Sequence, residues 1–241
     1  MAAVVLSGAA APAAAEFYVI NGRGAAVGTK ITSLPYAINA PGFYFLTGNL
    51  TLSSSSGGGA ISVNADDVTI DLMGFSLSYT GSYWSVGVSM DGRTNVEVRN
   101  GTVRGFTQAG IMENGSAGSK HRVVNVRAIN NTGGLGIFLH GSSHLVQDCT
   151  AANNNTGIWI DSGDITGCIA ANNDIGIWNQ GPGSVLDNTA SNNTSSNFFL
   201  GNGVATSLLA DGNSAFSRAT NYGKPSGTTG VVITANNAGK P

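Results

Sequence analysis

The chain has 241 residues, of which 41% are apolar and 10% are charged, and its formal net charge is -2. This composition excludes an intrinsically disordered chain, which needs few apolar residues and a high net charge. The weak charge gives no field for nucleic acid or an anionic membrane surface, and no run of eighteen apolar residues predicts a membrane span. We therefore expect one large folded domain or two small ones.

The first fifteen residues, MAAVVLSGAAAPAAA, are rich in alanine and uncharged. They end in small residues before Glu16, as a signal peptide does at an Ala-x-Ala cleavage site, but the basic start is missing. Residues 1–15 are thus either the remnant of a secretory signal or an ordinary apolar tail. Residues 16–58, which include SLPYAINAPGFYFLTGNLTL, are expected to cap the fold and to supply its first coil.

Short segments of similar sequence recur between residues 59 and 207. They are AISVN from Ala60, GVSMD from Gly87, GIMEN from Gly110, GIFLH from Gly136, GIWID from Gly157, GIWNQ from Gly176 and NFFLG from Asn197. Short β-branched runs alternate with clusters of Gly, Asn, Asp and Ser, and the helical spacing i, i+3, i+4, i+7 is absent. Strands and turns that repeat about every twenty residues predict a parallel β-helix of about seven to nine coils.

Side chains alternate between the inside and the outside of each coil, because successive residues of a strand point to opposite faces. The residue after each leading glycine is apolar and is expected inside, so the next residue is expected outside. In four consecutive coils this outside position holds Phe138, Trp159, Trp178 and Phe199. An exposed apolar stripe marks an interaction site, and aromatic faces pack well on sugar rings. Three explanations of the stripe stay open. It binds a sugar, it is covered by a terminal segment or another chain, or the register is wrong and the rings point inward.

Other repeated positions predict structural roles. An amide ladder inside the turns is predicted for Asn131, Asn154, Asn173 and Asn193. Cys149 and Cys168 fall on adjacent coils, either as buried stacked thiols or as a disulfide of demanding geometry. Glu113 takes a mostly inward position and is either a turn residue or a buried acid.

His140 and Asp161 are the candidate catalytic pair. They follow the aromatic positions of two adjacent coils, where a histidine can share a proton with a carboxylate and act as a base. His144 and Asp164 occupy the next turn and are candidate ligand-binding residues together with the aromatic stripe. Hydrogen bonding within the turns is the alternative role for all four. No metal ligands are predicted and no cofactor is expected, with calcium in one of the turns as the alternative.

Residues 208–241 lose the repeat, although GVVITANN near the end predicts a closing strand. We expect this segment to form a C-terminal coil and cap, since a solenoid needs atypical ends to cover its core.

Several segments resemble a known family: DDVTIDLMGFSL, VEVRNGTVRGF, HRVVNVRAINN and HLVQDCTAANNNTGIWI. Over about residues 16–215 the chain is similar to the right-handed parallel β-helix repeat proteins of bacteria, the pectate-lyase-like superfamily, and to its uncharacterised secreted members. The resemblance implies a single-domain, all-β solenoid and a link to polysaccharides through binding, depolymerisation or epimerisation. The Gly-His-Gly segment of polygalacturonases and the Asp-Pro-His segment of alginate epimerases are absent here, so the shared motifs imply a fold more than a reaction.

Two functions of different classes follow. The first is a secreted protein that binds or processes a polysaccharide on an outer face of the solenoid; as an enzyme it would be a lyase, an epimerase or a glycoside hydrolase. The second is a structural or adhesive surface subunit that self-assembles into a homo-oligomer or filament through its coil ends or the aromatic stripe. Both place the protein outside the cell or at its surface.

Overall fold

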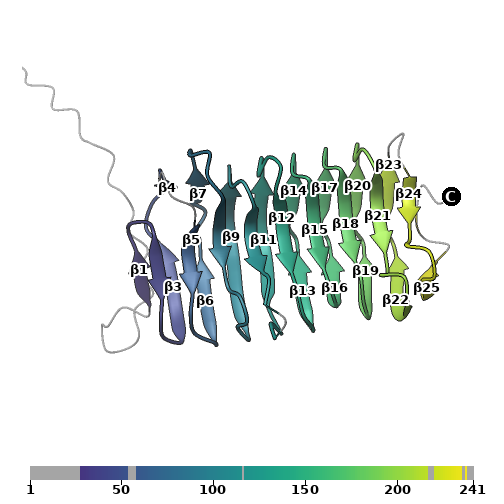
Figure 1. Ribbon diagram of the computed structural model, residues 1–241, viewed down its shortest axis with the longest axis horizontal. Helices are drawn as coiled ribbons and strands as arrows, with labels where there is room; N and C mark the ends of the chain where they lie inside the picture. The colour runs from purple at the N-terminus through teal and green to yellow at the C-terminus, as the bar shows by residue number, and fades with distance from the viewer. Residues whose placement is uncertain (1–27, 54–57, 116, 217–219, 235–236, 238–241) are drawn as a thin grey trace, which may run out of the picture.

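The computed structural model describes residues 28–53, 58–115, 117–216, 220–234 and 237. These residues form strands and turns, and none of them lies in a helix, so no described helix is long or apolar enough to cross a membrane. The predicted all-β, single-domain parallel β-helix is confirmed, as a solenoid of about eight turns (Figure 1). The expectation for residues 1–15 lies outside the described residues.

Two parallel sheets make up the walls of the solenoid. The nine-stranded sheet contains β2 (Tyr36–Ile38), β5 (Gly58–Val63), β8 (Ser85–Ser89), β10 (Ala109–Glu113), β12 (Leu135–Leu139), β15 (Thr156–Ile160), β18 (Ile175–Asn179), β21 (Ser196–Leu200) and β24 (Thr220–Gly223). Its strands follow one another coil by coil, and each pairs in parallel with the strand of the next coil.

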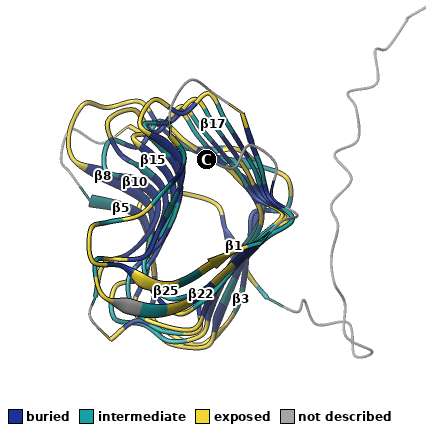
Figure 2. Ribbon diagram, turned by 90° about the vertical axis from the view of Figure 1, so that its right-hand side faces the viewer, coloured by how far each residue is buried: buried dark blue, intermediate teal, exposed yellow. Residues whose placement is uncertain are grey.

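The sixteen-stranded sheet bends and supplies the other two walls. One wall contains β1 (Thr29–Ile31), β3 (Gly42–Leu46), β6 (Val68–Asp71), β9 (Val96–Arg104), β11 (Arg122–Ile129), β13 (His144–Gln147), β16 (Gly163–Thr166), β19 (Gly183–Leu186), β22 (Ala205–Asp211) and β25 (Thr229–Ile233). The other contains β4 (Leu50–Leu52), β7 (Ser76–Tyr79), the ends of β9 and β11, β14 (Thr150–Ala152), β17 (Ile169–Ala171), β20 (Thr189–Ser191) and β23 (Ser214–Phe216). Figure 2 looks along the solenoid, with β5, β8, β10 and β15 on one side, β17 on a second and β3 and β22 on the third.

The register of the nine-stranded sheet follows the sequence repeat. The second residues of the repeated segments pair directly from coil to coil and are all 0% exposed: Ile61, Val88, Ile111, Ile137, Ile158, Ile177 and Phe198. Such a column of buried apolar side chains is the core of the solenoid, and its burial is the main stabilising term of the fold.

The predicted asparagine ladder is confirmed, and it explains the leading glycines. The amide oxygen of Asn173 accepts the backbone N–H of Asn154 at 2.9 Å, and Asn193 does the same for Asn173. A Cβ atom at Gly157 would lie 2.8 Å from Nδ2 of Asn173, and one at Gly176 would lie 2.6 Å from Nδ2 of Asn193. The coils that carry this ladder therefore need a glycine to make room for the amide that satisfies buried backbone groups.

A second buried ladder contains the two cysteines. Its members are Cys149, Cys168, Asn188, Asn213 and Asn237, each accepting or donating a hydrogen bond along the column. Cys168 Sγ lies 3.5 Å from the backbone N of Cys149, and Asn188 Oδ1 accepts the N–H of Cys168 at 2.8 Å. Both thiols are free and 1% exposed, so the stacked-thiol alternative is confirmed. The contact with Cys149 and burial raise the pKa of the Cys168 thiol well above its usual value.

The segment assigned to the C-terminal coil keeps the solenoid geometry even though its sequence loses the repeat. β23 pairs in parallel with β20, β24 with β21, and β25 with β22. Parallel pairing uses backbone groups, so it continues where the side-chain pattern has faded.

Candidate functional site

The aromatic row consists of Phe138, Trp159, Trp178 and Phe199, which lie in direct register on β12, β15, β18 and β21. The row lies on the outer side of the nine-stranded sheet, because the preceding residue of each strand points into the core. Ring centroids are 4.7 Å apart for Phe138 and Trp159, 4.3 Å for Trp159 and Trp178, and 5.2 Å for Trp178 and Phe199. The in-register outer stripe predicted from the sequence is therefore present.

The exposure of this row differs from the expectation. Phe138 is only 7% exposed and Met112, the preceding outer residue, only 3%, because both pack with Val86 and Ala109 in a second apolar cluster on the outer side of the sheet. Trp159, Trp178 and Phe199 are partly exposed. The usable surface of the row is thus its C-terminal part.

Stacking between Trp159 and Trp178 determines which parts of their rings a ligand can contact. Their ring planes are 12° apart and face one another, so mutual contact covers the facing π-surfaces and leaves ring edges toward solvent. Trp178 Nε1 donates to the carbonyl of Gly201 at 3.2 Å, whereas Trp159 Nε1 has no hydrogen-bond partner. The row is a rigid strip of ring edges, and the one unpaired N–H, that of Trp159, is buried.

His140 and Asp161 lie beside the row, one coil apart, as predicted. His140 Nδ1 is 3.3 Å from Asp161 Oδ2, and the side chains are 42% and 22% exposed. Asp161 Oδ2 also accepts the backbone N–H of Gly141 at 3.1 Å, which is a turn-stabilising contact. No ion pair of the described residues brings a lysine or arginine to this pair, so its catalytic role stays a prediction.

His144 and Asp164 do not meet. His144 pairs in register with Gly163, and Asp164 pairs with Leu145, so the two are offset by one residue. A one-residue offset sends side chains to opposite faces. His144 is 2% exposed and points into the core, which removes it from any ligand surface on the outside. Asp164 is exposed and accepts hydrogen bonds from the hydroxyl and N–H of Ser184.

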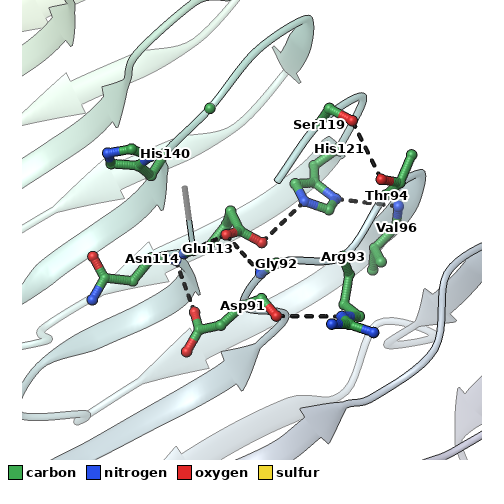
Figure 3. A network of polar contacts seen from close by, with 12 residues as sticks. Asp91, Gly92, Arg93, Thr94, Val96, Glu113, Asn114, Ser119, His121 and His140 are labelled. Carbon is green, nitrogen blue, oxygen red and sulfur yellow. Dashed lines mark hydrogen bonds and ion pairs between the residues drawn. The ribbon is translucent and has the colours of Figure 1, made fainter. Parts of the chain in front are cut away.

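A buried polar network lies at the corner beside these turns (Figure 3). Glu113 and His121 are 0% exposed, and Oε2 of Glu113 is 3.3 Å from Nε2 of His121. The other carboxyl oxygen accepts the N–H of Gly92 at 2.9 Å. Of the two roles predicted for Glu113, a turn residue or a buried acid, the structure shows the buried acid. No pattern in the sequence predicts this pairing, since it depends on how the corner folds.

His144 extends the network. Its ring stacks on that of His121 with centroids 5.2 Å apart. Nδ1 accepts the backbone N–H of His121, and Nε2 is 3.1 Å from the carbonyl of His140. Burial, and then the neighbouring charge of His121, lower the pKa of His144 from 6.5 to about 4, so the imidazole is neutral at neutral pH.

A separate groove lies on the sixteen-stranded sheet, where β9 and β11 bend. It encloses about 420 Å³ and is lined by polar side chains that include Asn100, Asn125, Arg127 and Asp148. Arg127 Nε donates to Thr102 Oγ1 at 3.0 Å. No aromatic side chain lines it.

Residues 36–235 match the model of a protein family described as "Periplasmic copper-binding protein (NosD)". The chain belongs to the NosD family. Among curated proteins, none matches the NosD chain by sequence.

Solved structures share the fold of this NosD member. The Dettilon tailspike protein is 16% identical with a TM-score of 0.50, and the match covers 88% of this chain and 60% of that one. The A-module of the Azotobacter vinelandii mannuronan C-5 epimerase AlgE4 is 12% identical with a TM-score of 0.52, covering 88% and 77%. The chain thus spans three fifths of the tailspike's length. At such identities the likeness shows the fold alone.

The described residues do not fit the copper of the family description. Copper takes imidazole nitrogen and sulfur ligands, yet His121 and His144 use their ring nitrogens within the core network and both cysteines are buried ladder members. No group of three or more His, Cys, Asp or Glu among the described residues is placed to hold a metal ion. Aspartate and glutamate are among these residue types, so no such group of the described residues supports the calcium alternative either.

Proposed function

We propose that the protein is a periplasmic or extracellular polysaccharide-binding β-helix that uses the outer side of its nine-stranded sheet. The observation that carries this proposal is the aromatic row with a row of polar turn residues directly beside it. His140, Asp161 and Gln180 follow the row residues Phe138, Trp159 and Trp178 by two positions and continue the coil-to-coil hydrogen bonding.

This pairing of rows has the chemistry that sugars require. Aromatic edges and faces contact the C–H surfaces of a sugar ring, while adjacent imidazole, carboxylate and amide groups bond its hydroxyls. The stacked rings hold each other in place, so little side-chain entropy is lost when a ligand binds.

Binding is favoured over processing. A glycosidase needs two carboxyl groups at a defined separation, and a lyase or epimerase needs a cation to stabilise the charge that develops on a uronate. His140 and Asp161 form a single acid–base pair whose carboxylate already holds the N–H of Gly141. A histidine that can act as a base is present, but the remaining parts of either reaction are not assembled around it.

The relatives support the choice of ligand class. The epimerase module is named for mannuronan, a polysaccharide, and it has the same solenoid fold. The family description supports a periplasmic location. Neither likeness extends to individual side chains, so the ligand assignment depends on the aromatic row.

A second candidate is self-association through the last coil. Five of the exposed large apolar side chains among the described residues lie between residues 204 and 233: Val204, Leu209, Phe216, Val232 and Ile233. Leu209 and Val232 are direct neighbours on β22 and β25, and β25 is the last strand of its sheet path. Light scattering across a concentration series tests this candidate: growth in mass that is abolished by Val232→Lys supports it, and a constant monomer mass contradicts it.

The polysaccharide proposal is tested by affinity electrophoresis against a panel of neutral and uronate polymers, with absorbance monitored for unsaturated products. We expect retardation by at least one polymer without turnover. Retardation by none of them would refute the proposal, and turnover would replace binding by catalysis.

A further inference from the structure

Two adjacent aromatic side chains stand apart from the aromatic row. Tyr83 and Trp84 lie between β7 and β8, and each is 56% exposed. By contrast, Trp159 and Trp178 are only partly exposed. Trp84 immediately precedes β8, so it stands where the chain enters the nine-stranded sheet.

The backbone beneath these rings is fixed by hydrogen bonds. Tyr83 donates its N–H to the hydroxyl of Tyr79 at 3.1 Å, and its carbonyl accepts the hydroxyl of Thr107 at 2.7 Å. The carbonyl of Trp84 accepts the N–H of Gly58 at 3.0 Å. Tyr79 is itself buried and stacks on Phe106 with centroids 5.9 Å apart. The two exposed rings therefore project from a scaffold anchored in the core.

This pair differs from the aromatic row in its ring contacts. Among the described residues, no ring or cation contact involves Tyr83 or Trp84. In the aromatic row, stacking between Trp159 and Trp178 covers the facing surfaces. A sugar ring that stacks flat on an aromatic ring can therefore do so at Tyr83 and Trp84.

The surroundings favour an uncharged, hydroxyl-bearing ligand. The segment from Thr80 to Trp84 carries no charged residue and contributes the hydroxyls of Thr80, Ser82 and Tyr83. A large exposed aromatic pair with hydroxyls and no charge matches the alternating C–H and O–H surface of a sugar ring.

We propose that Tyr83 and Trp84 form the ring-stacking subsite for the polysaccharide, in addition to the aromatic row; this inference depends on the proposed function. The strands β8, β10, β12, β15, β18 and β21 are successive neighbours. The coil of Trp84 is thus five steps from that of Phe199, or about 24 Å along the solenoid at about 4.8 Å a step. A ligand that contacts both ends is an oligosaccharide of several residues, so affinity rises with chain length.

The double variant Tyr83→Ala/Trp84→Ala tests this assignment. Phe216→Ala is the matched control, since Phe216 is 58% exposed and lies on the last coil of the other sheet. Affinity for the polymer found in the panel is measured by titration calorimetry, and melting temperature reports folding. We expect the double variant to bind at least about tenfold more weakly, with an unchanged melting temperature, while the control binds as the wild type does.

A second readout follows Trp84 directly. Acrylamide quenches an exposed indole, so adding the polymer is expected to reduce quenching clearly more in the wild type than in Trp84→Phe, in which only the partly exposed Trp159 and Trp178 remain. If the wild type binds polymer and the double variant binds equally well, the subsite is wrong and the proposed function stands. An equal loss in Phe216→Ala would mean unspecific apolar adhesion, which also contradicts the subsite. No binding by the wild type would overturn both proposals.

Discussion

A Cβ atom at Gly157 would lie 2.8 Å from Nδ2 of Asn173, on the next coil. The same relationship links Gly136 with Asn154 and Gly176 with Asn193. The glycine column and the amide ladder therefore depend on each other. The missing side chain at Gly157 leaves room for the amide of Asn173, which satisfies the backbone N–H of Asn154 and the carbonyl of Ala151 on the coil of the glycine.

Gly157→Ala should destabilise the solenoid. The added methyl group has backbone oxygen of Gly176 at 2.6 Å as well as the amide of Asn173, and overpacking a buried site costs about 1–3 kcal/mol. Gly48→Ala is the control, because nothing lies within 4 Å of a Cβ at Gly48. Urea unfolding followed by circular dichroism measures both. Equal midpoints for the two variants would mean that the glycine column is not needed for the ladder.

The cysteine ladder predicts opposite effects for two substitutions. Asn188→Ala removes the acceptor of the Cys168 N–H and the donor to the carbonyl of Ile165, and each buried group left unpaired costs about 1–3 kcal/mol. Cys168→Asn places an amide where the following coils already have one, so stability should be kept or raised by about 1 kcal/mol. Thermal melts compare the two. A strongly destabilised Cys168→Asn would show that the thiol positions are not equivalent to the asparagine positions.

Acid should weaken the fold through His144. Its folded pKa of about 4 is below the unfolded value of 6.5, so the unfolded chain binds the proton first. The stabilisation is complete above about pH 6.5 and is lost as the pH falls toward 4, by up to about 3 kcal/mol. The facing groups are His121 and Glu113 from within the core and the carbonyl of His140.

Stability measured in urea from pH 4 to pH 7 tests this. The slope between pH 4 and 6.5 should be much smaller in His144→Asn, while the exposed His140→Asn keeps it. An unchanged slope in His144→Asn would assign the acid sensitivity to another group.

The repeat in the sequence was enough to predict the fold and much of the site. Because every coil adds one in-register strand, aligned segments predict neighbours: Trp159 over Trp178, and His140 beside Asp161. The same logic predicted the ladder of Asn154 and Asn173. Period and register are properties of the chain itself, so they can be obtained without coordinates.

Features outside the repeat could not be obtained in this way. Comparison of the repeated segments places His144 and Asp164 on one turn, but they are one residue out of register. Turn lengths vary between coils, and a shift of one residue reverses the face to which a side chain points. The burial of Phe138 depends on Ala109 and Val86, which lie one and two coils earlier in the chain. The contact of Glu113 with His121 and the exposed pair at residues 83–84 depend on corners and loops, which have no period.

The central claim is that the outer side of the nine-stranded sheet binds a polysaccharide, and Trp178→Ala tests it most directly. Trp178 lies in the middle of the partly exposed stretch of the aromatic row, between Trp159 and Phe199. Calorimetric titration with the polymer retained in the panel should show affinity reduced by about tenfold, with Ile169→Ala on the other sheet, an exposed apolar residue, binding as the wild type does. Equal affinity of Trp178→Ala and the wild type, with both folded, would contradict the account.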